Sequence, residues 1–181
     1  NMSFKPSRTS DLKTVLTAAT IRLEKLGTKH ITQRYADWFN DPLVTQFTRH
    51  GARRFTIEDV TEYVQSVKDS NTTLVFAVIR TSDERHIGNV SLNDISWANK
   101  SGEISILLGD RSAWGQGAGQ EAVKTVMDFA FNDLKLHRVW LGMTVDDLPM
   151  IGIAKKLGFH HEGVLKEALF KNGRFHDISQ W

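Results

Sequence analysis

Residues 103–134 constrain the fold more than any other stretch, because the hydrophobic period of the chain changes within them. Up to Leu108 the stretch is apolar and rich in β-branched side chains, which favours a short strand. Glycine then occupies every second position, at Gly115, Gly117 and Gly119. Beyond the glycines, apolar residues recur at spacings of three and four, which is typical of an amphipathic helix. The stretch therefore predicts a strand, a glycine-rich turn and a helix.

The glycine-rich turn predicts a site for a phosphate group. Without Cβ atoms a backbone comes close to a bulky ligand, and the first turn of a helix presents unpaired N–H groups at the positive end of its dipole. Two common nucleotide motifs are excluded. Gln120 stands where a dinucleotide fingerprint has its third glycine, and no Lys-Ser or Lys-Thr pair follows, as a P-loop requires. A turn that binds no ligand is the alternative.

The composition is that of an ordinary soluble globular domain. The chain has 181 residues, of which 40% are hydrophobic and 24% charged, and its net charge of +2 shows no concentrated basic stripe. We therefore expect one cytoplasmic domain, with no nucleic acid and no membrane among its partners. The absence of cysteine excludes a disulfide framework, a thiolate zinc site and a cysteine acyl-enzyme. The histidines show no ligand spacing, so no metal is expected.

Periodicity and turn residues predict the other elements. Thr56 and Asp59 resemble a capping box, Asp146 or Asp147 is placed to cap a later helix, and Asn172-Gly173 predicts a hairpin. We expect helices at residues 32–39, 56–67 and up to residue 157, and strands at residues 21–23, 74–79, 87–97, 137–145, 159–170 and 175–181. The strands up to residue 108 predict an antiparallel meander. Residues 1–20 predict a tail in which Asn1, before Met2, is a remnant of cloning, and residues 21–181 predict a single domain.

Residues 114–122, W-G-Q-G-A-G-Q-E-A, resemble the acyl-CoA pyrophosphate loop of the GNAT acetyltransferases, whose pattern is Arg/Gln-x-x-Gly-x-Gly/Ala. Trp114 takes the first position, as is familiar in the RimJ/RimL-like branch, and Gly117 and Gly119 take the others. Two further segments are similar to that branch: residues 35–42, Y-x-x-W-x-N-D-P, and residues 155–163, K-K-L-G-F-x-H-E-G. The three segments together indicate a GNAT protein of the RimJ/RimL-like branch.

The resemblance covers residues 21–181 and implies an α+β, GNAT-like fold of three layers. This fold has a mostly antiparallel twisted sheet with a central splayed pair of parallel strands and helices on both faces. It also implies acetyl-CoA as cosubstrate, bound between the splayed strands. The pantetheine arm would follow the backbone of Ile106, Leu107 and Leu108, and an amide near Leu107 would hold the oxyanion of the tetrahedral intermediate. The pyrophosphate would lie on the loop, namely Trp114, Gly115, Gln116, Gly117, Ala118 and Gly119.

The start of the last predicted helix departs from the family pattern. Asp147 stands where the family usually has an Asn that contacts CoA, and Met150 stands where it usually has a Ser that protonates the leaving thiolate. Met has no proton to give, and the only tyrosines, Tyr35 and Tyr63, lie in the first two predicted helices. The general acid is left unassigned: protonation by water and a weak or altered acetyltransferase are both open.

A primary amine attacks a thioester only as the free base, so the reaction needs a group that takes up the ammonium proton. The resemblance places this general base at Glu103, whose pKa would rise if the carboxylate were buried beside apolar residues. A Glu103 paired with a neighbouring Lys or Arg is the structural alternative. Asp94 is the second candidate. His176 and Asp177 are the third, although Asp177 is expected to be a structural partner near the hairpin.

Arg49, Arg53 and Arg54 form the densest positive patch. Guanidinium groups fit carboxylates and phosphates, so the patch favours an anionic acceptor, with a solvated loop as the alternative. The predicted activity is transfer of an acetyl group from acetyl-CoA to a primary amine, such as a protein N-terminus or a nucleotide-linked amino sugar, by direct attack in a ternary complex. A non-catalytic acyl-CoA-binding module is the main alternative. An enzyme on a doubly wound sheet is disfavoured, because residues 74–108 show no helix between their strands.

The edge of the C-terminal hairpin is a candidate surface for a homodimer, because an exposed strand edge can pair with another chain.

Overall fold

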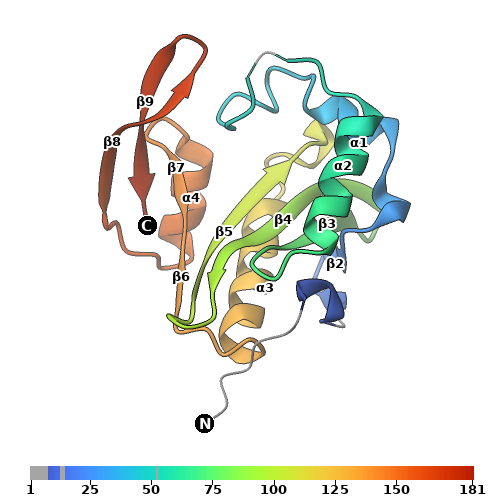
Figure 1. Ribbon diagram of the computed structural model, residues 1–181, viewed down its shortest axis with the longest axis horizontal. Helices are drawn as coiled ribbons and strands as arrows, with labels where there is room; N and C mark the ends of the chain where they lie inside the picture. The colour runs from blue at the N-terminus through green and yellow to red at the C-terminus, as the bar shows by residue number, and fades with distance from the viewer. Residues whose placement is uncertain (1–7, 13–14, 52) are drawn as a thin grey trace.

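The computed structural model describes residues 8–12, 15–51 and 53–181, which form two β-sheets with helices packed on them (Figure 1). The larger sheet has the strand order β1-β2-β3-β4-β5-β6. Neighbouring strands are antiparallel except β5 and β6, which are parallel. The predicted meander of β3, β4 and β5 is confirmed. The strands are β1 (Val15–Thr17), β2 (Ile21–Lys25), β3 (Leu74–Arg80), β4 (Arg85–Ser96), β5 (Ser101–Leu108) and β6 (Arg138–Trp140).

Helices cover both faces of the larger sheet, which produces the predicted three layers. On one face lie α1 (Gln33–Trp38) and α2 (Ile57–Lys68), which share a buried cluster with Val75 and Ala77 of β3. On the other face lies α3 (Ala118–Asn132), whose buried cluster includes Val90 of β4 and Ile104 of β5. Successive residues of a strand face opposite sides, so the same strands supply both clusters.

A smaller sheet carries the C-terminal part of the chain. Its order is β7-β9-β8, formed by β7 (Gly142–Thr144), β8 (Gly163–Lys171) and β9 (Arg174–Gln180), and α4 (Leu148–Lys156) connects β7 to β8. In the turn of the hairpin, Asn172 and Gly173 have φ angles of 52° and 77°, the left-handed pair that a two-residue hairpin loop uses. The predicted hairpin is confirmed.

The prediction of one strand over residues 137–145 is wrong, because the chain changes partner at Leu141. β6 pairs with β5 of the larger sheet, whereas β7 pairs with β9 of the smaller sheet. Leu141 and Trp181 exchange two backbone hydrogen bonds of 2.9 Å. Leu141 thus already belongs to the pairing with the strand that ends at Trp181.

The boundary of the predicted tail at residue 20 is also corrected. β1 pairs with β2, and Thr9–Asp11 forms a short 3-10 helix whose Thr9 is buried within hydrogen-bond distance of the carbonyl oxygens of Ser70 and Thr73. Elements of three residues are too short to show a period in the sequence. Residues 1–7, 13 and 14, including Asn1, lie outside the described residues.

Two predicted helix starts are confirmed. Thr56 and Asp59 form a capping box at α2, and the Asp147 carboxylate caps α4. Two further 3-10 helices occur at Thr28–His30 and Arg111–Ala113. Within the described residues, no helix combines the length and the apolar character that crossing a membrane requires.

Candidate active site

The open edge of β5 is the central feature of the site. β5 and β6 pair over three residues only, and the last pair joins Glu103 to Trp140. β5 continues to Leu108 with β4 on one side and none of the described strands on the other, since β7 belongs to the smaller sheet. The predicted splayed pair of parallel strands is therefore present. Along residues 104–108 the backbone groups on that edge lack a strand partner and can bind an extended chain.

The glycine-rich loop lies at the far end of β5, where α3 begins. The Trp114 indole N–H donates a hydrogen bond of 2.9 Å to the carbonyl oxygen of Leu108, which ties the loop to the strand. Gly117 is the N-cap residue of α3 with φ of 82°, and no side chain caps the helix. The first amides of this 15-residue helix are thus free to bind an anion.

The space around the loop fits the pyrophosphate of a CoA ligand. A Cβ atom at Gly115 or Gly117 would meet no atom within 4 Å, so the backbone there is open to a ligand. Gly119 has a different role, because a Cβ atom there would lie 3.3 Å from Ile153 Cδ1 of α4. Gly119 therefore lets α3 approach α4 closely. Ala118 is buried, and Gln116 donates a hydrogen bond to the carbonyl oxygen of Ser112.

Polar side chains line one face of β4 and β5, on the side of the larger sheet that carries α1 and α2. On this side β3 is apolar, whereas the corresponding residues of β4 and β5 are polar except for Leu107, which packs on the apolar cluster. We call this surface the polar floor; it consists of Asn89, Ser91, Asn93, Glu103 and Ser105. It was not predicted from the sequence, although the alternation N-V-S-L-N at residues 89–93 was a signal for it.

Glu103 is the acidic member of the polar floor. Its carboxylate makes no hydrogen bond or ion pair with any described residue. The structure therefore does not show the alternative in which Glu103 pairs with a neighbouring Lys or Arg. Burial raises the pKa of Glu103, the positive charge of Arg49 opposes this shift, and the negative charge of Asp94 adds to it. A carboxylate with a raised pKa and no partner is suited to proton transfer near neutral pH.

The other proposed bases have different surroundings. Asp94 is exposed on a bulge of β4 with φ of 47°, near enough to Glu103 to raise its pKa but outside the floor. The Asp177 carboxylate forms an ion pair of 2.8 Å with Lys166 and accepts a hydrogen bond from the Glu167 amide, and these contacts lower its pKa. His176 Nε2 lies 3.3 Å from the carbonyl oxygen of Lys171. His176 and Asp177 therefore make contacts within their own hairpin.

Asp147 and Met150 lie at the start of α4. Asp147 accepts a hydrogen bond of 3.2 Å from the Met150 amide, and burial raises the pKa of its carboxyl group. Met150 packs against the core cluster under α3. Tyr35 and Tyr63 lie on α1 and α2, as predicted, and burial raises the pKa of both phenols.

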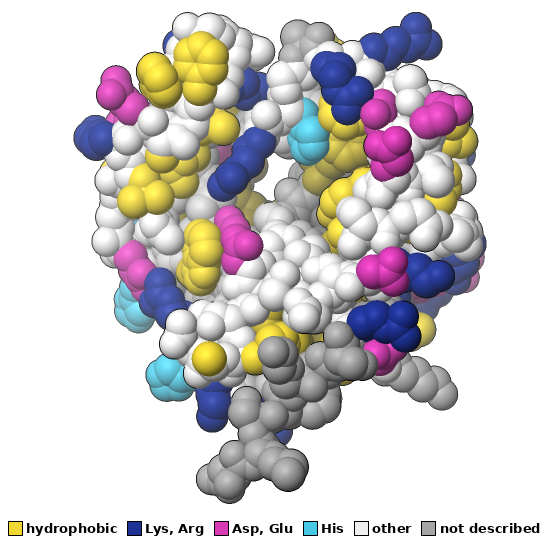
Figure 2. All heavy atoms as spheres, viewed as in Figure 1, with side chains coloured by type: hydrophobic (Ala, Val, Ile, Leu, Met, Phe, Trp, Pro, Cys, Tyr) yellow, Lys and Arg dark blue, Asp and Glu magenta, His cyan; other side chains and the backbone are white. Residues whose placement is uncertain are grey.

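The arginine patch lies on the loop between α1 and α2. Arg53 pairs with Asp59 at 3.1 Å and lies over the Phe55 ring, whereas Arg49 and Arg54 are exposed. Arg53 and Arg54 line a cavity of about 330 Å³ together with His50 and Lys171. Figure 2 shows a hollow between the side of the molecule that carries α1 and α2 and the side formed by the smaller sheet. The cavity is lined from two sides, by Arg53 and Arg54 on the loop and by Lys171 and Asn172 of the hairpin.

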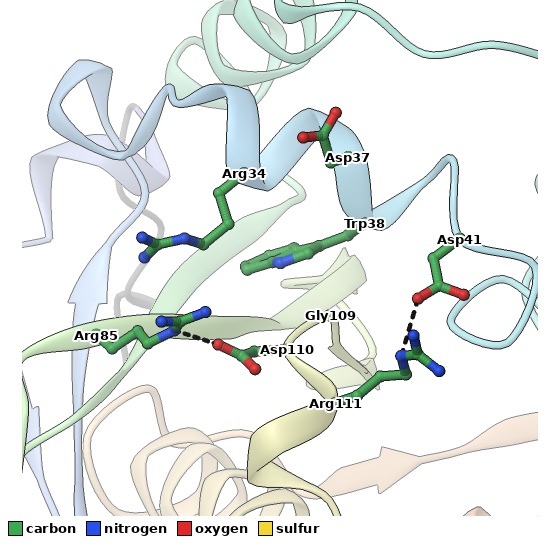
Figure 3. A pocket seen from close by; sticks show the side chains of 8 residues that line it. All are labelled: Arg34, Asp37, Trp38, Asp41, Arg85, Gly109, Asp110 and Arg111. Carbon is green, nitrogen blue, oxygen red and sulfur yellow. Dashed lines mark hydrogen bonds and ion pairs between the residues drawn. The ribbon is translucent and has the colours of Figure 1, made fainter.

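A second cavity, of about 490 Å³, lies between α1 and the end of β5 (Figure 3). Two of its arginines are paired, Arg85 with Asp110 and Arg111 with Asp41. Trp38 forms its floor and packs so closely on Gly109 that a Cβ atom there would lie 1.9 Å from the indole. These contacts join α1 to β5, and we assign this cavity no ligand.

Sequence comparison decides the family. A family profile described as an acetyltransferase (GNAT) domain matches residues 20–160. The chain belongs to the GNAT acetyltransferases. Among the GNAT relatives, "Probable N-acetyltransferase YjcK" of Bacillus subtilis is 35% identical over 119 residues, or 65% of each chain, so the match spans just under two thirds of that protein. The spermidine N(1)-acetyltransferase of Vibrio cholerae is 28% identical over 103 residues, which are 57% of this chain and 59% of the relative.

Solved structures of the family share the fold. The spermidine N-acetyltransferase of Vibrio cholerae, solved in complex with CoA and spermine, has a TM-score of 0.80 at 21% identity and covers 90% of this chain and 94% of its own. The ribosomal-protein-S5-alanine acetyltransferase of Vibrio fischeri has a TM-score of 0.79 at 20% identity, with 93% and 96% covered. At this identity the likeness shows the GNAT fold alone. No cluster of three potential metal ligands occurs in the part of the chain that the structure describes.

Proposed function

We propose that this GNAT protein transfers an acetyl group from acetyl-CoA to a primary amine by direct attack in a ternary complex. One observation carries the proposal: the unpaired Glu103 carboxylate, whose pKa burial raises, lies where β5 and β6 separate. The glycine-rich loop lies at the other end of the same open edge. A carrier anchored by its phosphates at the loop would thus present its acyl end beside Glu103.

The proposed reaction forms an amide and releases the CoA thiol. The amine nitrogen attacks the thioester carbonyl carbon, and the new C–N bond gives a tetrahedral oxyanion that collapses as the C–S bond breaks. Glu103 takes up the proton that the amine loses, directly or through one water molecule. The CoA thiolate leaves and takes up a proton from water, since Met150 has none to give. A backbone amide near Leu107 would stabilise the oxyanion.

The cosubstrate would be held mostly by backbone. The residues that would carry its pantetheine arm are Ile106, Leu107 and Leu108, on the open edge of β5. The pyrophosphate would accept hydrogen bonds from the loop and the start of α3, and Asp147 would contact the cosubstrate from the start of α4. Trp114, Gly115 and Gly117 complete this cradle, and Gly119 would contribute its backbone amide from the first turn of α3.

The acceptor is proposed to carry an anionic group beside its amine. Arg53 and Arg54 line the cavity beside Lys171, and Arg49 lies near enough to Glu103 to lower its pKa. Such guanidinium groups repel a polycation and attract a carboxylate or phosphate. A protein N-terminus with nearby acidic residues and a nucleotide-linked amino sugar both fit this requirement. The loop at Trp114 and the segments at residues 35–42 and 155–163 support a place in the RimJ/RimL-like branch.

A non-catalytic acyl-CoA-binding module is the second candidate, because Met150 supplies no acid at the start of α4. Release of the CoA thiol distinguishes the acetyltransferase from the non-catalytic module, because only the enzyme breaks the thioester. We would add a panel of amines, including spermidine, amino sugars, nucleotide-linked amino sugars and acidic peptides, to the purified protein with acetyl-CoA. Amine-dependent release of free thiol, strongest with anionic acceptors, is the expected result. Tight acetyl-CoA binding without release for any amine would favour the module.

A further inference from the structure

Three side chains of the polar floor form a closed triangle of hydrogen bonds. Asn93 Nδ2 lies 3.0 Å from Ser91 Oγ and 2.8 Å from Ser105 Oγ. The two serine oxygens lie 2.8 Å from each other. None of the three side chains has another protein partner among the described residues.

The number of available protons decides how the Asn93 amide is oriented. With the amide nitrogen toward the serines, its two hydrogens serve the two Asn–Ser contacts and one hydroxyl proton serves the Ser–Ser contact. With the amide reversed, both hydroxyl protons would be used on the amide oxygen. The 2.8 Å Ser–Ser contact would then have no proton. The triangle therefore requires the nitrogen of Asn93 to face the serines.

This orientation leaves the Asn93 carbonyl oxygen without a donor. The oxygen lies on the other side of the planar amide from the serines. Asn93 is the direct cross-strand partner of Glu103, so the two side chains lie on one face with Cβ atoms about 4.5–5.5 Å apart. Two hydrogen-bond acceptors, the Asn93 oxygen and the Glu103 carboxylate, thus lie on the same face of neighbouring strands, without donors among the described residues, and a Glu103 carboxylate oxygen lies toward Gly142, where β5 and β6 separate.

We propose that the Asn93 carbonyl oxygen and the Glu103 carboxylate together hold the two N–H groups of the acceptor amine. This inference rests on the proposed function and adds a substrate contact to it. A free primary amine has two hydrogens and one lone pair. If both hydrogens are bound on the floor, the lone pair is directed away from them, toward the open edge of β5 where the acyl group would lie. Ser91 and Ser105 are positioning residues, because they fix the amide that receives the amine.

Asn93→Ala tests the contact by removing the acceptor oxygen. We expect kcat/KM for the amine to fall by about 10- to 100-fold, as for a lost hydrogen bond to a polar or charged group, while the Kd for acetyl-CoA stays within twofold. Asn132→Ala, the same substitution at an exposed position at the end of α3, is the matched control and should change neither value. An Asn93→Ala variant with kcat/KM within twofold of the parent overturns the assignment.

Asn93→Asp is the second variant, and it decides the matter if Asn93→Ala fails to fold or loses acetyl-CoA affinity. It keeps the shape of the side chain and places a second negative charge beside Glu103. Like charges raise a carboxyl pKa, so the acid limb of the kcat/KM profile should move to higher pH. The movement tests whether residue 93 lies beside the general base, as the proposal requires, and an unmoved limb overturns the proposal. If the parent protein releases no thiol with any amine, the proposed function fails together with the Asn93 contact. If the parent is active and only the Asn93 variants behave otherwise than expected, the Asn93 contact alone fails.

Discussion

The Lys171 ammonium group at the end of β8 donates a hydrogen bond of 2.6 Å to the carbonyl oxygen of Thr48, on the loop between α1 and α2. The same ammonium group also bonds the carbonyl oxygens of Thr45 and Gln46. One buried side chain thus joins the hairpin of the smaller sheet to the loop that carries Arg49.

Lys171→Met removes this tie while it keeps a long side chain. Three carbonyl groups lose their donor, so we expect the free energy of unfolding to fall by about 1–3 kcal/mol. The KM for the amine should rise, because the loop with Arg49 is released, and the Kd for acetyl-CoA should not change. Denaturant unfolding and steady-state kinetics measure both effects. Lys155→Met, at an exposed position on α4, is the control. An unchanged amine KM in a destabilised Lys171→Met variant would show that the tie has no role in acceptor binding.

Gly117→Trp should abolish acetyl-CoA binding by filling the space above the loop. Part of any effect is backbone strain, because Gly117 has φ of 82°. Gly158, at the end of α4, has φ of 81° and also has no atom within 4 Å of a Cβ position, so Gly158→Trp imposes the same strain away from the loop. Isothermal titration should show the affinity lost for Gly117→Trp and kept for Gly158→Trp. Equal affinities in both variants would mean that the loop does not hold the cosubstrate.

Gly109→Ala should destabilise the protein, because the added Cβ atom would overlap the buried Trp38 indole at 1.9 Å. Overpacking of this kind costs about 1–3 kcal/mol. Gly152→Ala, in α4 with open space around it, should instead add about 0.5–1 kcal/mol through helix propensity. Thermal unfolding of the two variants should therefore move the midpoint in opposite directions. A Gly109→Ala variant as stable as the parent would contradict the close packing of α1 on β5.

Much of the fold was predictable because its signals are local. A cap at Thr56 or Asp147 and the left-handed turn at Asn172-Gly173 each depend on a few adjacent residues. The partner change at Leu141 was not predictable, since it depends on pairing with Trp181, which is distant along the chain. Local signals therefore predict individual helices and turns, whereas pairing between distant segments decides where one strand ends and the next begins.

The site was predictable only in part for the same reason. The glycine spacing pointed to the loop, and the family resemblance pointed to Glu103. The polar floor depends on the register of β4 against β5, which places Asn93 beside Glu103 and Ser91 beside Ser105. Register is a tertiary property that one strand's sequence does not contain.

The charges near Glu103 should move its pKa in opposite directions. Asp94 raises the pKa of Glu103 and Arg49 lowers it. Asp94→Asn should therefore shift the acid limb of the kcat/KM profile to lower pH, and Arg49→Met should shift it to higher pH. Shifts in the same direction would show that the limb belongs to another group.

The sign of the effect on stability follows from the raised pKa of Glu103. The folded protein holds the proton more tightly than the unfolded chain, so its contribution to stability is present at acid pH and is lost as the pH rises through the folded pKa. Glu103→Gln stays neutral, so this variant should be more stable than the parent at neutral pH, and the difference should disappear in acid. Urea unfolding at several pH values measures it. A variant less stable than the parent at neutral pH would contradict the buried, unpaired carboxylate.

The most direct test of Glu103 as general base is the pH profile of kcat/KM for the best amine, measured for the parent and for Glu103→Gln. We expect the loss in the variant to be largest near neutral pH and to shrink at high pH, where more of the amine is already the free base. Acetyl-CoA affinity should be the same in both proteins. An equal loss at every pH would contradict a role in proton removal and leave Glu103 a structural residue.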